Sequence, residues 1–137
     1  MDNVNSKKLE YVDYLDLNHR YYIVIALRKE LEDHLYDCSF TDDKGDILEG
    51  YEGMWFDEKA FLLMEKYLFN FINAECDLLI NMYEEEYIDL DQLSKAEEIT
   101  KCMINNSDNR EFIKLANKFL SIVKKAISLN TFVGLCF

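Results

Sequence analysis

The sequence of 137 residues contains no proline and only four glycines, at positions 45, 50, 53 and 134. Proline and glycine mark the turns of most β-rich folds, so their scarcity favours long uninterrupted helices over a many-stranded sandwich. Long apolar runs are also missing, because no stretch approaches the roughly 18 residues that a membrane span needs. The first ten residues, MDNVNSKKLE, hold no apolar run, so we expect no export signal.

Close cysteine pairs are missing as well. The four cysteines lie far apart, at positions 38, 76, 102 and 136, without a CxxC motif. Zinc sites usually contain such pairs, so we predict no metal site. Two disulfides would suit a secreted chain. Without an export signal we instead predict buried thiols in a reducing compartment, and a cytoplasmic localisation.

The sequence lacks the common catalytic and ligand-binding signatures. Glycine-rich phosphate loops and the basic aromatic motifs of nucleic-acid readers are absent. The loop from Asp42 to Glu52 does not place acids and glycine at the positions that an EF-hand requires. His34 and Cys38 are four residues apart and could pair, but Cys38 lies on an apolar stripe, where cysteine is usually a buried hydrophobe. We therefore predict a protein that is not an enzyme and has no cofactor.

What the sequence does contain is a strong helical periodicity. Half of the residues are hydrophobic, which is typical of a chain that folds around one core. The spacing of apolar residues predicts helices over residues 18–39, 57–85, 94–105 and 109–127. Asp57 is the predicted N-cap of the second helix, and Ser94 begins a capping box for the third. Within the first helix, the run YYIVIAL would also suit a buried strand.

These elements predict a mainly α, single-domain bundle of about four helices that spans residues 1–137. The first eight residues are expected to be mobile. Three of the four glycines fall within residues 40–56, which we interpret as an acidic loop with room for a short hairpin. The apolar tail TFVGLCF, residues 131–137, is predicted to dock back on the core.

The net charge of −12 is concentrated in the middle of the chain. Between residues 33 and 98, nineteen acidic residues face only four lysines, whereas basic residues predominate beyond residue 98. A field of this kind repels nucleic acid and anionic membranes and attracts basic surfaces. The sequence therefore predicts a basic protein partner, with no direct nucleic-acid or membrane contact.

The densest acidic stretch is NMYEEEYIDLDQ, residues 81–92. We expect it at the C-terminal end of the second helix, where acids oppose the helix dipole, so folding alone does not account for it. A solvated helix end is the alternative interpretation. Tyrosines among carboxylates can anchor an interface that the charges steer. The predicted partner-binding residues are Glu84, Glu85, Glu86, Tyr87, Asp89 and Asp91, followed by a second set of Asp42, Asp43, Asp46, Glu49 and Glu52. Trp55, beside the second set, is expected in the core.

In size, acidity, helical pattern and lack of catalytic motifs, the chain resembles the small acidic bacterial immunity proteins that neutralise nuclease toxins. The resemblance implies an antitoxin-like inhibitor that binds a basic nuclease toxin domain. From the charge distribution we expect a monomer or a weak homodimer, in which the basic C-terminal helix meets the acidic middle of a second copy. One alternative is an inhibitor that mimics nucleic acid, such as an anti-CRISPR or anti-restriction protein. A regulatory interaction domain is another. The net basic C-terminal region favours a localised acidic interface over a mimic.

Overall fold

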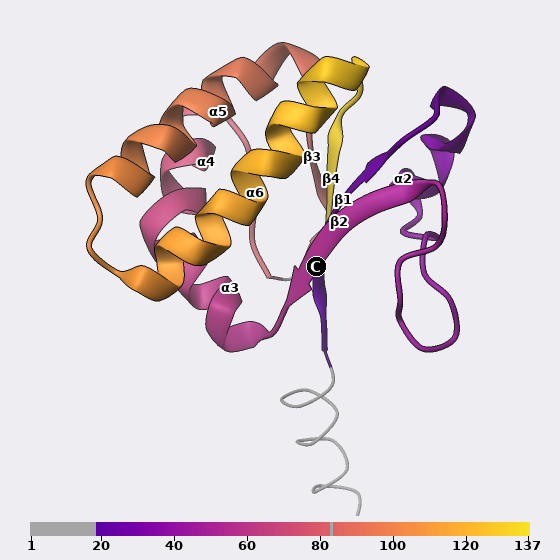
Figure 1. The fold of residues 1–137 in the computed structure, drawn as a ribbon, viewed down its shortest axis with the longest axis horizontal. Coiled ribbons are helices and arrows are strands. Elements are labelled where there is room, and N and C mark those ends of the chain that lie inside the picture. Colours follow the sequence, from indigo (N-terminus) through magenta and orange to yellow (C-terminus); the bar gives the residue numbers. More distant parts are fainter. Residues whose placement is uncertain (1–18, 83) are drawn as a thin grey trace, which may run out of the picture.

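The computed structural model describes residues 19–82 and 84–137, so the predicted mobility of residues 1–8 concerns residues outside those described. The fold combines helices with a four-stranded antiparallel sheet of order β2-β1-β4-β3 (Figure 1). The prediction of a helical bundle is therefore wrong. The strands are β1 (Tyr21–Ala26), β2 (Tyr51–Phe56), β3 (Glu86–Ile88) and β4 (Val133–Cys136).

Strand β1 replaces most of the first predicted helix. Its sequence YYIVIA is rich in β-branched and aromatic residues, and all of its residues except Tyr22 are buried. A strand that is covered on both faces has a continuous apolar run, which also matches a helical pattern. In the rest of the range predicted as the first helix, the structure has two short helices, η1 (Lys29–Leu31) and α2 (Asp33–Tyr36).

The remaining helices form a layer on one side of the sheet (Figure 1). They are α3 (Glu58–Met64), the π-helical segment η2 (Glu65–Phe69), α4 (Asn70–Cys76), α5 (Leu90–Asn105) and α6 (Arg110–Leu129). The predicted cap at Asp57 is confirmed, because its side chain accepts a 2.9 Å hydrogen bond from the Ala60 amide. The predicted capping box at Ser94 is wrong, because α5 begins four residues earlier.

The second predicted helix ends earlier than its apolar pattern indicates, whereas the fourth agrees with the sequence. The second predicted helix was expected to reach residue 85, but α4 ends at Cys76, where Asp77 takes a left-handed backbone with φ of 58°. The apolar residues that follow, Leu78 to Ile80, therefore belong to a loop. Helix α6 agrees with the sequence, and Asn109 caps it by accepting from the Phe112 amide.

The C-terminal tail docks on the core, as predicted, and forms a central strand. β4 lies between β1 and β3, and its four residues are all buried. In the glycine-containing loop, a single bridge joins Thr41 to Ile47, and β2 pairs with β1. Gly53 is required in β2, because a Cβ there would lie 2.2 Å from the Ile23 carbonyl oxygen.

The sheet separates two apolar clusters, because successive residues of β1 point to opposite faces. Tyr21, Ile23 and Ile25 belong to the large cluster beneath the helices. Val24 and Ala26 belong to a smaller cluster with Leu35, Phe40, Phe132 and Cys136. Helix α2 and residues 37–50 cover this second face (Figure 1), and we refer to them as the outer layer.

Candidate acidic interface

The stretch from residue 84 to 91 does not lie at a helix C-terminus. It runs through a loop, along β3 and into the start of α5. Asp89 is the N-cap residue of α5 and Asp91 lies in its first turn, where carboxylates stabilise the helix dipole. The expected conflict between acids and dipole is therefore wrong for these two residues, although the Asp89 side chain accepts no capping hydrogen bond.

Glu86 also has a structural role. Its two carboxylate oxygens accept hydrogen bonds from the Leu79 amide at 2.9 Å and from its own neighbour, the Tyr87 amide, at 3.0 Å. These bonds fix the loop after α4 against β3. Glu86 is thus a weaker candidate for partner binding than its position in the sequence suggested.

Glu84 and Glu85 remain without such an explanation. Both are exposed, and among the described residues no lysine or arginine forms an ion pair with either. Exposed carboxylates of like charge repel one another unless a cation approaches them. These two side chains are available to a partner.

Tyr87 connects the acidic loop to the outer layer. Its hydroxyl donates a 3.0 Å hydrogen bond to the backbone oxygen of Tyr36 in α2. The Tyr36 and Tyr87 rings meet edge to face with centroids 5.0 Å apart, and the Tyr36 ring stacks on Phe132 at 5.0 Å. Tyr36 is nevertheless 52% exposed. An aromatic platform is therefore open to solvent beside the acids.

The carboxylates around Tyr87 come from two distant parts of the chain. Desolvation raises the pKa of the Tyr87 hydroxyl, and the nearby charges of Glu85, Glu86 and Asp37 raise it further. Asp37 follows α2 directly and is exposed. We name the surface formed by Tyr36, Asp37, Glu85 and Tyr87, together with the exposed Glu84 that precedes Glu85 in the loop, the acidic aromatic face.

Sequence reasoning missed Tyr36 and Asp37. They lie in the run EDHLYD, residues 32–37, which has the same mixture of acids and tyrosine as the stretch EEEY. The interpretation of residues 18–39 as one amphipathic helix concealed that similarity. The contact between Tyr36 and Tyr87 spans 51 residues of sequence, so no local pattern could indicate it.

The second predicted set does not form one surface. Asp42 accepts hydrogen bonds from the Lys44 and Asp46 amides at 2.8 and 3.0 Å, and Asp46 lies 4.0 Å from Arg20. Glu52 instead pairs with Lys125 of α6 at 2.8 Å, on the helical side of the sheet. Asp43 and Glu49 are exposed in the loop.

Trp55 is 47% exposed, so its predicted burial in the core is wrong. It lies on the edge strand β2 opposite Tyr22, and therefore on the outer face of the sheet. The Arg20 guanidinium lies 4.0 Å above its ring, a distance typical of a cation–π contact. This arginine therefore already has an aromatic and an acidic partner.

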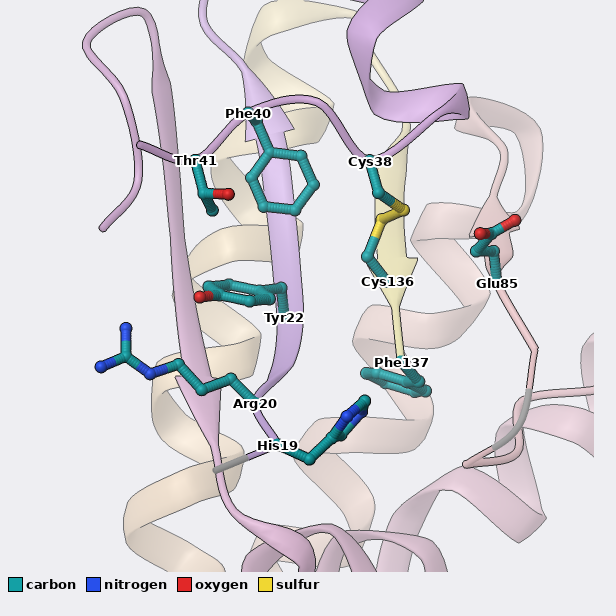
Figure 2. Close-up of a pocket in the computed structure, with 9 residues that line it drawn as sticks. All are labelled: His19, Arg20, Tyr22, Cys38, Phe40, Thr41, Glu85, Cys136 and Phe137. Atoms are coloured by element: carbon teal, nitrogen blue, oxygen red, sulfur yellow. A yellow bond between two sulfur atoms is a disulfide. The ribbon is translucent and has the colours of Figure 1, made fainter. Parts of the chain in front are cut away.

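A pocket of about 210 Å³ lies beside the acidic aromatic face (Figure 2). Tyr22 and Phe40 stand on one side of it, and Glu85 lies on the other. Its wall includes a disulfide between Cys38 and Cys136, whose Cα atoms are 6.1 Å apart.

This disulfide corrects the prediction of four buried thiols. Cys76 is a buried free thiol, but the free thiol of Cys102 is exposed. Cys38 is bonded to Cys136, so it has no thiolate to pair with the exposed His34. Among the described residues, no three His, Cys, Asp or Glu side chains form a group that could hold a metal ion.

No helix in the described part of the chain is long and apolar enough to cross a bilayer. Comparisons of the sequence and structure with protein-family models, curated proteins and solved structures found no match. The functional argument therefore depends on the geometry of the acidic aromatic face.

Proposed function

We propose that this protein is a non-catalytic immunity protein, which binds a basic nuclease toxin through the acidic aromatic face. The observation that supports this most strongly is the contact of the half-exposed Tyr36 ring with the partly buried Tyr87 ring, bordered by the carboxylates of Asp37 and Glu85. Charged residues alone give attraction without a desolvated anchor. Tyrosines supply that anchor, because interface hot spots are enriched in tyrosine, tryptophan and arginine.

The proposed inhibition has two steps. The negative field first steers the toxin toward the face, which increases the association rate at low ionic strength. Arginine or lysine side chains of the toxin then pair with Glu84, Glu85 and Asp37, while an arginine stacks on the exposed Tyr36 ring. The cations that would bind nucleic-acid phosphates, or a neighbouring surface of the toxin, are thereby covered.

The compartment and assembly belong to the same proposal. We propose a cytoplasmic site of action, because a nuclease toxin meets its nucleic-acid target there. The cysteines at positions 38 and 136 do not support this compartment, since they form a disulfide and disulfides persist in oxidising surroundings. A monomer or weak homodimer is expected, and sedimentation at two salt concentrations would distinguish them. A nucleic-acid mimic is less well supported, because its acids would extend over most of one surface.

A matched pair of charge reversals tests the face. Glu84→Lys with Glu85→Lys reverses the charge of two exposed acids of the face, whereas Glu75→Lys with Glu98→Lys makes the same change in charge at exposed positions of α4 and α5. Each tagged protein is used to capture partners from its native cells, and any captured nuclease is then purified and titrated. We expect the face variant to associate about tenfold more slowly at low salt, with the difference shrinking as salt screens the charges.

Two results would overturn the proposal. Equal nuclease association by the two double variants would show that the face is not the interface. A captured partner that is neither basic nor inhibited on titration would exclude the immunity function. A third variant, Tyr36→Ala, separates the anchor from steering, because it should increase the dissociation rate and leave the salt dependence of association unchanged.

A further inference from the structure

The Cys38–Cys136 disulfide joins the loop after α2 to the central strand β4. Cys136 belongs to β4, which is paired on both sides within the sheet. Cys38 lies in the loop after α2, two residues from Tyr36 and next to Asp37. The bond therefore attaches one half of the acidic aromatic face to the centre of the sheet, across 98 residues of sequence.

Both cysteines line the pocket of about 210 Å³ (Figure 2). Cys38 is partly exposed, whereas Cys136 is 7% exposed. The pocket gives a small molecule a route to the disulfide without opening the large helical core. Thiol–disulfide exchange depends on this kind of access, because the attacking sulfur must reach one sulfur of the bond.

Apart from the disulfide, the outer layer is attached by the six-residue apolar cluster, to which it contributes Leu35 and Phe40, and by a few polar bonds. Arg20 and Tyr22 donate to the Gly45 carbonyl oxygen, and Tyr87 donates to that of Tyr36 at 3.0 Å. Cys38 itself has φ of 57°, in the left-handed region that a cysteine rarely adopts. Without the disulfide, this local backbone loses a covalent constraint, while β4 keeps both neighbouring strands.

From this geometry we propose that the Cys38–Cys136 disulfide is a thiol-reducible latch that holds the acidic aromatic face in its binding arrangement. The thiolate of a small thiol attacks the sulfur of Cys38, the more exposed cysteine, and the Cys136 sulfur leaves and takes up a proton. A second thiol attacks the mixed disulfide, releases a small-molecule disulfide and leaves Cys38 as a thiol. Two thiols thus supply the two electrons that reduce the bond.

The consequence for binding rests on the proposed function. In the oxidised protein, Tyr36 and Asp37 are held against Tyr87 and Glu85. In the reduced protein, residues 33–50 move away from the sheet more often, so the partner must order them again, and its affinity falls about tenfold. The tight-binding state is the oxidised one, so in a reducing cytoplasm the protein binds its partner in the weaker, reduced state, and oxidation there strengthens inhibition.

The chain contains its own controls for the first test. Native full-length protein is incubated with reduced glutathione, labelled with a maleimide and mapped by peptide mass spectrometry. Cys102 is exposed and reports that labelling works, whereas Cys76 is buried beneath the helices and reports global unfolding. We expect Cys38 and Cys136 to be labelled while Cys76 stays protected. Labelling of all three at one rate would overturn the latch.

Hydrogen exchange then tests the structural effect. In the reduced protein, and in a Cys38→Ser, Cys136→Ser variant, amides of residues 33–50 should exchange about tenfold faster, with β1 and α6 unchanged. Unchanged exchange in residues 33–50, or faster exchange throughout the chain, would overturn the latch.

Nuclease binding separates the two proposals. If the reversals at Glu84 and Glu85 weaken binding but reduction does not, the latch fails and the proposed interface stands. If reduction opens residues 33–50 but the reversals have no effect, the proposed interface fails instead.

Discussion

The two faces of the sheet are held by different means. Beneath the helices, twenty-two buried residues of the described chain form one apolar cluster, with Phe61, Phe69, Phe112 and Phe119 fully enclosed. On the outer face, only six buried residues form the corresponding cluster, and a disulfide and several polar bonds supplement it.

The difference separates the face that supplies most of the stability from the face that carries the proposed binding surface. Hydrophobic stabilisation grows with the apolar area removed from water, so the helical face supplies most of it. The outer layer buries fewer apolar residues and leaves Tyr36 half exposed beside acids that have no ion-pair partner among the described residues. The outer face has few buried contacts, so exposed aromatic and acidic groups there do not disturb the larger core.

The largest expected effect comes from truncating the core of the helical face. Phe119→Ala removes a fully buried ring that meets Phe69 edge to face. Buried Phe→Ala substitutions usually cost about 3–5 kcal/mol, and we expect the upper part of that range because neighbouring helices cannot close the cavity. Urea denaturation gives the change in the free energy of unfolding.

Phe40→Ala in the outer cluster is the matched control. Phe40 is also fully buried, but it lies in a loop that can shift toward the space left by the ring. Its cost should fall near the lower end, about 3 kcal/mol. Equal losses for the two variants would contradict the distinction between the faces.

The next largest effect is expected when the disulfide is removed. The Cys38→Ser, Cys136→Ser variant lacks a cross-link that closes a loop of nearly one hundred residues in the unfolded chain. The typical loss is about 2–4 kcal/mol. Denaturation of the variant, compared with wild type in the absence of reductant, measures it. A loss below about 0.5 kcal/mol, the range of ordinary surface changes, would show that the bond adds little to the outer face.

A smaller loss of stability is expected when a methyl group is added to strand β2. Gly53→Ala places Cβ 2.2 Å from the Ile23 carbonyl oxygen and 2.9 Å from Val24 Cα, so β1 and β2 must separate. Overpacking of this kind costs about 1–3 kcal/mol. Gly134→Ala is the control, because its nearest contacts, at 3.6 Å, are ordinary ones. Thermal unfolding of both variants should show a loss only at Gly53.

The contrast between the faces also explains what the sequence could predict. Helix α6 and the cap at Asp57 follow from local patterns, and both were predicted. β1 was misread because a strand buried by two clusters has no alternation. β3 has only three residues and depends on pairing with β4, which lies more than forty residues further along the chain. Glu84, Glu85 and Tyr87 were predicted from composition, whereas tertiary contacts alone bring Tyr36 and Asp37 beside them.

The smallest predicted effect concerns the pKa of Tyr87. Desolvation and then the charges of Glu85, Tyr36, Glu86 and Asp37 raise this pKa above the ordinary value of 10.0. Because the folded-state pKa is the higher one, the contribution to stability is complete below the unfolded pKa and is lost as pH rises through the folded value.

Absorbance titration of wild type against Tyr87→Phe should therefore show one phenol that ionises at a higher pH than an ordinary tyrosine. Glu85→Gln should lower its pKa only slightly, because desolvation is the larger cause. If Tyr87 instead ionised at its ordinary pKa, the outer layer would not hold Tyr36 and Asp37 against it, and the acidic aromatic face would lose one side.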